Sequence, residues 1–268
     1  MDTNYILEIM KEKKNDVIEK LVNEKGQDKT VSYFGEFLDN RSYFTIDRNG
    51  KIGRKNMNYA LPVAAFSESS AEVAREILVC AKAEERVKLK KIERMSKESL
   101  DNLMKNFMKI IANNNVNFAI KYAKEIFLRD SELFYKTLFH YTLLEEIDSQ
   151  KTLMALSLKK LMKTEVDDNL IYLAMSYISK VKGNFNEYEN TIPVTVMTKS
   201  ELIKKVLESK EKLRSKKGMN LLAYVGILNE YDYDNEEIFI NIALKRLEEV
   251  KNTQENLTHT ENIIHNGL

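Results

Sequence analysis

The residues best spaced for chemistry are four basic side chains that recur at four-residue intervals. On a helix, Lys82, Arg86, Lys90 and Arg94 would form one row with steps of about 6 Å, a spacing suited to successive phosphates. A second basic stretch covers residues 199–217. Helices spanning 82–97 and 199–217 are therefore candidate nucleic-acid surfaces. Their candidate contacts are Lys82, Arg86, Lys90, Lys91, Arg94, Lys205, Lys212 and Lys216.

The same basic residues also fit two solvated helix faces. Acidic residues such as Glu85 and Glu208 can form ordinary pairs with them along a helix. Aromatic residues, on which the bases of single-stranded nucleic acid stack, do not alternate with these cations. We favour solvated faces, and nucleic acid stays as an alternative partner.

An acidic and aromatic turn stands before the last expected helix. Tyr231, Asp232, Tyr233 and Asp234 could contact a basic segment of a partner protein. Acidic residues also favour the positive end of a helix dipole, and we prefer this explanation for the turn. The four residues remain candidate protein contacts.

Few other residues are placed for catalysis or metal binding. His140 lies inside an expected helix without a carboxylate partner at a suitable spacing, and Cys80 lies among apolar residues. His259 and His265 are six residues apart, which fits no common zinc pair on a helix. No phosphate-binding loop, dinucleotide fingerprint or nucleophile elbow occurs. We therefore expect no metal and no cofactor, and we make no catalytic assignment.

Composition predicts a helical protein without a membrane segment. The 268 residues are 43 % hydrophobic and carry a net charge of +1, so there is no overall attraction to nucleic acid or anionic lipid. Two prolines and eight glycines are few for a β-rich fold, which uses them in turns. The N-terminus lacks a secretory pattern, and no run approaches the roughly 20 apolar residues of a membrane span. We expect a soluble, cytoplasmic protein with no membrane partner.

Hydrophobic periodicity predicts a series of paired antiparallel helices. Apolar stripes indicate helices over residues 4–25, 31–38 and 69–95. The starts of five later helices are 15 to 19 residues apart, so that a pair of helices repeats about every 34–38 residues. The expected fold class is all-α, a short solenoid-like array of helix pairs. The expected caps of these five helices are Ser96, Asn115, Asp130, Ser149 and Asp168.

Four regions follow from this pattern. Residues 1–66 would be a helical cap with one small β-hairpin at residues 43–53, where Asn49-Gly50 favours a tight turn. Residues 67–183 would be the helical array. Pro193 then breaks the helical pattern, and a Thr198/Glu201 capping box opens a C-terminal helical group over 184–250. Residues 251–268 are expected to be a mobile tail.

Helical arrays commonly present a groove to another macromolecule. The first functional hypothesis is therefore a non-enzymatic module that binds a protein partner. The alternatives are a nucleic-acid-binding protein that uses both basic helices on one continuous face, and an enzyme without a recognisable motif. The last would require a deep pocket with converging polar groups.

Overall fold

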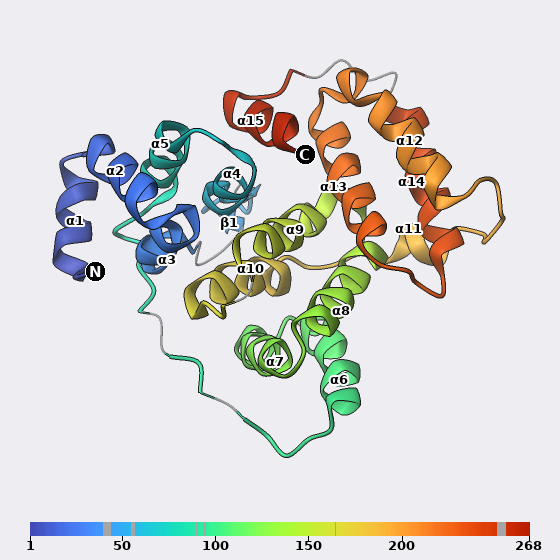
Figure 1. Cartoon of the computed structure of the whole chain (residues 1–268), viewed down its shortest axis with the longest axis horizontal. Coiled ribbons are helices and arrows are strands. Elements are labelled where there is room, and N and C mark those ends of the chain that lie inside the picture. The colour runs from blue at the N-terminus through green and yellow to red at the C-terminus, as the bar shows by residue number, and fades with distance from the viewer. Residues whose placement is uncertain (40–43, 55–56, 89–90, 94, 164, 251–255) are drawn as a thin grey trace.

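A computed structural model describes residues 1–268 except 40–43, 55–56, 89–90, 94, 164 and 251–255 (Figure 1). The α-helices of the first half are α1 (Thr3–Lys11), α2 (Asn15–Lys25), α3 (Gln27–Leu38), α4 (Ala60–Phe66), α5 (Ser70–Cys80), α6 (Leu100–Ala112) and α7 (Val116–Arg129). Those of the second half are α8 (Ser131–Leu144), α9 (Lys151–Leu161), α10 (Asp168–Lys180), α11 (Asn186–Glu189), α12 (Lys199–Glu208), α13 (Lys216–Glu230), α14 (Glu236–Val250) and α15 (His259–Gly267). Two short 3-10 helices, η1 (Ile147–Ser149) and η2 (Lys210–Leu213), complete the helical elements.

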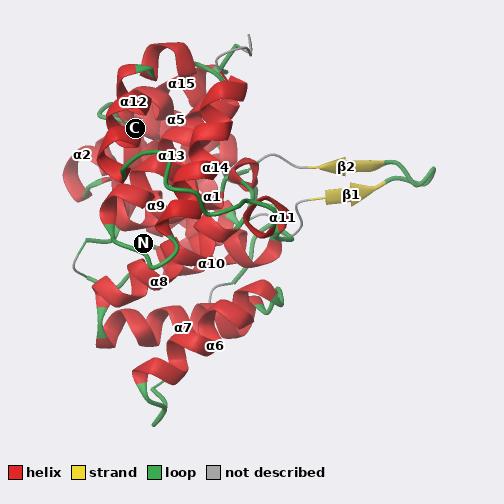
Figure 2. Cartoon of the chain, turned by 90° about the vertical axis from the view of Figure 1, so that its right-hand side faces the viewer, coloured by secondary structure: helices red, strands yellow, loops and turns green. Residues whose placement is uncertain are grey.

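The all-α class is confirmed. The strands of the described chain, β1 (Phe44–Ile46) and β2 (Ile52–Arg54), form the predicted antiparallel hairpin, with Ile46 paired to Ile52. Gly50 adopts a φ of 77° in the connecting turn, a conformation that glycine tolerates best. The hairpin projects away from the helical body (Figure 2).

Polar caps fix several helix starts where the sequence predicts them. The side chains of Asn115, Asp130 and Thr198 accept hydrogen bonds from the first turns of α7, α8 and α12. Thr198 and Glu201 form the full predicted capping box. Three other predicted caps are displaced, because α6 is capped by Ser99 instead of Ser96, α9 starts after Gln150 instead of Ser149, and α10 is capped by Asp167 instead of Asp168.

The helices α6 to α10 pack one against the next, but the predicted repeat is not confirmed. In a solenoid each repeat contacts only its neighbours. Here α10 packs on both α7 and α3, and α4 packs on α9. These contacts join helices from the predicted regions 1–66 and 67–183 in one hydrophobic core. The division into regions remains a prediction.

The helix expected over residues 4–25 is two helices. Lys13 has a left-handed φ of 51° between α1 and α2. Lys14 then forms ion pairs of 2.8 Å with both Glu8 and Glu12, which hold the chain across the break. The buried positions are Ile6, Ile9, Ile18 and Val22. Each is one residue away from the apolar stripe that the sequence suggests, which consists of Leu7, Met10, Val17 and Leu21.

The helix expected over residues 69–95 ends at Cys80, so the prediction for its second half is wrong. The following chain bonds to α3 instead of continuing the helix. The Lys82 N–H donates to the Phe37 carbonyl at 2.9 Å, and the Val87 N–H donates to the Glu36 carbonyl at 2.8 Å. These carbonyls belong to the last turn of α3, where helical partners are missing.

The expected mobile tail is also corrected, because residues 259–267 form α15. Thr258 and Glu261 make a reciprocal capping box at its start. Ile264 and His265 are buried, and the helix packs on α4 and α13. No helix in the described part of the chain combines the length and apolar character needed to cross a bilayer.

Candidate partner-binding groove

A groove of about 1100 Å³ lies between α1 and α5. Its floor is apolar and includes half-buried side chains of both helices. Val79 of α5 is exposed, with 60 % of its surface accessible. The apolar lining consists of Leu7, Met10, Ala71, Leu78, Val79, Ala81 and Ala83. We call this feature the α1/α5 groove.

Each wall of the α1/α5 groove results from apolar residues on two adjacent helix faces. In α1, Ile6 and Ile9 enter the core, whereas Leu7 and Met10 are one position further round and line the groove. In α5, Ile77 is buried and the next residue, Leu78, faces the groove. Leu7, Met10 and Leu78 pack partly against the core, and their remaining apolar surface lines the groove.

The rim of the groove is mainly basic. Lys11, Lys13, Arg75 and Lys82 lie around it, against Glu72 and Glu84. Glu72 is already engaged, since one carboxylate oxygen lies 2.7 Å from Arg75 Nη2 and the other lies 3.1 Å from His259 Nε2. The groove therefore combines an apolar floor with lysines at its edge, a surface suited to an apolar and acidic ligand.

The α1 wall is held by few contacts. Its principal neighbour is α2, to which it is joined through the left-handed Lys13. An element with few buried contacts opens at a lower free energy than the rest of a domain. Of the two walls of the groove, α1 is therefore the one expected to open at the lower free energy.

The first set of predicted nucleic-acid contacts does not form a helical row. Lys82 lies at the α1/α5 groove, whereas Arg86 forms an ion pair of 2.7 Å with Glu36 and lies over the Phe37 ring. Lys91 is exposed, with Glu93 at 3.5 Å. Lys90 and Arg94 lie outside the described residues.

The second set is divided among three elements. Lys205 on α12 lies 3.7 Å from Glu248, Lys212 is in η2, and Lys216 starts α13. The predicted helix over 198–216 therefore ends at Glu208. The segment that follows α5 lies on the opposite side of the molecule from helix α12 (Figure 1). Those candidate contacts that the structure describes do not make the continuous basic face that the nucleic-acid hypothesis requires.

The acidic and aromatic turn contacts lysines of the chain itself. The Lys159 ammonium lies 4.5 Å from the Tyr231 ring centre, and the Tyr231 hydroxyl donates to Glu132 at 2.6 Å. Burial and the neighbouring carboxylates raise the pKa of Tyr231, so its hydroxyl keeps its proton.

The rest of the turn is engaged in the same way. Lys199 pairs with Asp232 at 2.5 Å and with Glu236 at 2.8 Å. Tyr233 is buried against His140, and Asp234 is exposed. Part of the turn therefore contacts lysines of its own fold, and its contact with a partner protein stays a prediction.

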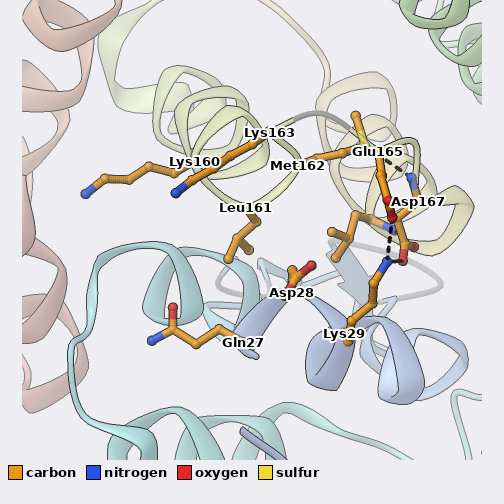
Figure 3. A pocket seen from close by; sticks show the side chains of 10 residues that line it. Gln27, Asp28, Lys29, Lys160, Leu161, Met162, Lys163, Glu165 and Asp167 are labelled. Atoms are coloured by element: carbon orange, nitrogen blue, oxygen red, sulfur yellow. Dashed lines mark hydrogen bonds and ion pairs between the residues drawn. The ribbon is translucent and has the colours of Figure 1, made fainter. Parts of the chain in front are cut away.

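A smaller, polar pocket of about 410 Å³ lies between the start of α3 and the end of α9 (Figure 3). Lys29 lies 3.9 Å from both Glu165 and Asp167, while Lys160 and Lys163 extend side by side in another direction. Burial and the nearby Lys210 and Lys163 lower the pKa of Lys160. The described lining residues include amines and carboxylates but no hydroxyl, thiol or imidazole that a base could activate.

Comparison of the chain with protein-family models, with curated proteins and with solved structures finds no match. Within the described residues no group of three or more His, Cys, Asp or Glu is arranged to hold a metal ion. The α1/α5 groove is consequently the feature whose shape and chemistry carry the functional argument.

Proposed function

We propose that this protein is a helical interaction module that binds an amphipathic helix of a partner protein in the α1/α5 groove. The observation that supports the proposal is the exposed apolar floor between two helices, with Val79 and Leu78 on one wall and Met10 on the other. An amphipathic helix placed in a groove is a common mode of peptide recognition.

The dimensions of the groove suit a short helix. The α5 wall belongs to a helix of 11 residues, which is about 16 Å long at 1.5 Å per residue. About three turns of a partner helix would cover that length and place about three apolar anchors, at positions i, i+3 or i+4 and i+7, on the floor.

The rim indicates the charge of the partner. Lys11 and Lys13 lie at the α1 end, and Lys82 lies just beyond α5, so the exposed flanks of a bound helix would face lysines. Acidic residues on those flanks would be attracted, and basic ones would be repelled. We therefore commit to a partner helix that is apolar on one face and acidic on its edges.

A peptide-display selection tests this proposal. A library of natural-protein peptides is selected on the folded protein and, in parallel, on Val79→Asp, which places a charge on the groove floor. A matched control is Leu207→Asp, because Leu207 is an exposed leucine on the remote helix α12. The proposal predicts that acidic peptides with helical apolar spacing are enriched on the wild type and the control, but not on Val79→Asp.

Individual peptides from that selection give the quantitative test. Their dissociation constants should rise at least about tenfold with Val79→Asp, which is typical for a residue at the centre of an interface. Lys11→Glu with Lys13→Glu should weaken the same peptides and reduce the salt dependence of binding. Selected peptides that are basic, or that bind Val79→Asp unchanged, would overturn the proposal.

A further inference from the structure

The β-hairpin carries an apolar face that nothing in the described chain covers. Phe44 and Ile46 are two residues apart on β1, and Ile52 is the cross-strand partner of Ile46, so all three lie on one face. Their exposed fractions are 57 %, 62 % and 62 %. The hairpin points away from the helical body (Figure 2). We call residues 44–54 the hairpin arm.

The tip of the hairpin arm is basic. The Asp47 carboxylate accepts hydrogen bonds from the N–H groups of Asn49 and Lys51 and is used inside the turn. The side chains of Arg48 and Lys51 are exposed. Since an isolated two-stranded hairpin is marginally stable in water, an arm of this kind gains most from a partner surface that is apolar and acidic.

The chain itself has a surface of this kind on the segment after α11. Ile192, Val194 and Val196 alternate along it and are 74 %, 54 % and 62 % exposed. Asn241 Nδ2 holds the segment in place by donating to the carbonyls of Ile192 and Val194, each at 3.0 Å. We call residues 191–197 the receiving segment.

Two exposed acidic side chains border the receiving segment, and the exposed Lys245 lies near Thr191 at its start. Glu189 is exposed at the end of α11. Glu237 is exposed at the start of α14 and accepts a hydrogen bond of 2.7 Å from the Thr195 hydroxyl. The segment therefore matches the hairpin arm in both apolar character and charge.

We propose that two copies of this chain form a dimer in which the hairpin arm of each copy packs on the receiving segment of the other. The arm extends outward from the helical body (Figure 2), and the loop after α11 lies at another side of the molecule (Figure 1), which leaves both surfaces free for a second copy. Direct pairing of two arms is disfavoured because their tips carry like charges. Reciprocal exchange uses each surface once per copy and closes the assembly at two chains.

Sedimentation equilibrium of the full chain measures this association. The wild type should show a concentration-dependent monomer–dimer equilibrium, which weakens at higher salt because the charged contacts are screened. Ile46→Asp should raise the dissociation constant at least about tenfold, since every dimer contains two altered arms. Leu207→Asp serves as the control, because this exposed residue of α12 is outside both surfaces.

A charge exchange identifies the two surfaces as partners. Arg48→Glu with Lys51→Glu should abolish the dimer by placing acidic tips against Glu189 and Glu237. Combining these changes with Glu189→Lys and Glu237→Lys should restore the dimer to within about tenfold of the wild type. All four side chains are exposed, so circular dichroism and thermal melting should show an unchanged fold.

Three results would overturn the proposal. The first is a wild type that remains monomeric up to about 1 mM. The second is a dimer that Ile46→Asp leaves intact, and the third is a charge exchange that fails to restore association. Binding of the Arg48 and Lys51 tip to a duplex DNA probe, with a monomeric chain, would assign the hairpin arm to nucleic acid instead.

Discussion

Lys151 Nζ lies 2.7 Å from Glu145 Oε1, and their side chains are only 1 % and 0 % exposed. The ammonium also lies 5.5 Å from the centre of the Tyr141 ring. Burial lowers the pKa of Lys151, and the adjacent Glu145 opposes this effect. The ion pair therefore joins the end of α8 to the start of α9 inside the core, across the short helix η1 that connects them.

Lys151→Met should destabilise the fold by about 3–5 kcal/mol, because Glu145 would keep a buried charge without its partner. Lys151→Met combined with Glu145→Leu removes both charges and should be closer in stability to the wild type. Urea unfolding followed by circular dichroism measures both. Lys20→Met is the control, because the Lys20–Glu24 pair is exposed and should contribute less than about 1 kcal/mol. An equally unstable double variant would show that the pair is not the cause.

His265 should make the fold less stable in acid. Burial, together with Arg214 and Lys210, lowers the pKa of His265 below 6.5, whereas Glu211 acts in the opposite direction. As the pH falls below 6.5, the unfolded chain takes up a proton that the native His265 resists. The unfolded state then binds more protons than the native state. This group therefore lowers the free energy of unfolding by at most about 1.4 kcal/mol for each pH unit below 6.5.

His265→Leu should reduce the loss of stability between pH 7.5 and pH 5.5, which urea unfolding at several pH values would measure. The remaining acid sensitivity should include His140, whose pKa is also lowered by burial. His259→Gln is the matched control, because His259 is mostly exposed. An unchanged pH profile for His265→Leu would contradict the assignment.

Gly267→Ala should detach α15 from α4. A Cβ atom at this position would lie 2.1 Å from the Phe66 carbonyl oxygen, so one of the two backbones must move. Overpacking of this kind typically destabilises by about 1–3 kcal/mol. Hydrogen exchange should then lose protection over residues 259–267, while α13 keeps it.

Gly226→Ala provides the comparison for this variant. Its Cβ would meet only the flexible end of Leu156 at 3.3 Å, and alanine favours the helical backbone of α13. Protection of α15 should be unchanged in this control. Full protection of α15 in Gly267→Ala would show that the contact with Phe66 does not limit its docking.

Arg86→Met should loosen the chain that follows α5. Arg86 holds this segment by donating from Nε to Glu36 at 2.8 Å and by lying over the Phe37 ring. Losing both contacts should increase local opening by about 1 kcal/mol, which corresponds to a several-fold faster tryptic cleavage at Lys88. Lys82→Met is the control with an exposed side chain, and equal cleavage of the two variants would refute the role of Arg86.

The sequence predicts the elements that depend on local interactions. The caps at Asn115, Asp130 and Thr198 follow from side chains that bond to N–H groups two or three residues away. The same signal was present in Thr258 and Glu261 but was outweighed by the polar composition of the final residues. The hairpin formed by β1 and β2 is likewise a local consequence of its turn.

The end of α5 could not be predicted, because distant groups determine it. The segment 81–88 has neither a glycine nor a proline, and its N–H groups leave the helix to reach carbonyls of Glu36 and Phe37. The α1/α5 groove likewise depends on packing between distant residues, which a local sequence pattern does not show. Periodicity shows that Leu7 and Met10 are apolar on a helix, but only tertiary packing decides that Ile6 and Ile9 take the core positions.

The contact of α15 with α5 also determines when the N-terminal part of this fold can be completed. His259 and Glu72 are separated by 187 residues along the chain. At a synthesis rate of about 5–20 residues per second, Glu72 waits about 10–40 s on the ribosome before its partner exists. During that interval α4 and α5 are exposed where α15 will later cover them, so nascent chains of this protein should be good clients for chaperones that bind apolar helices.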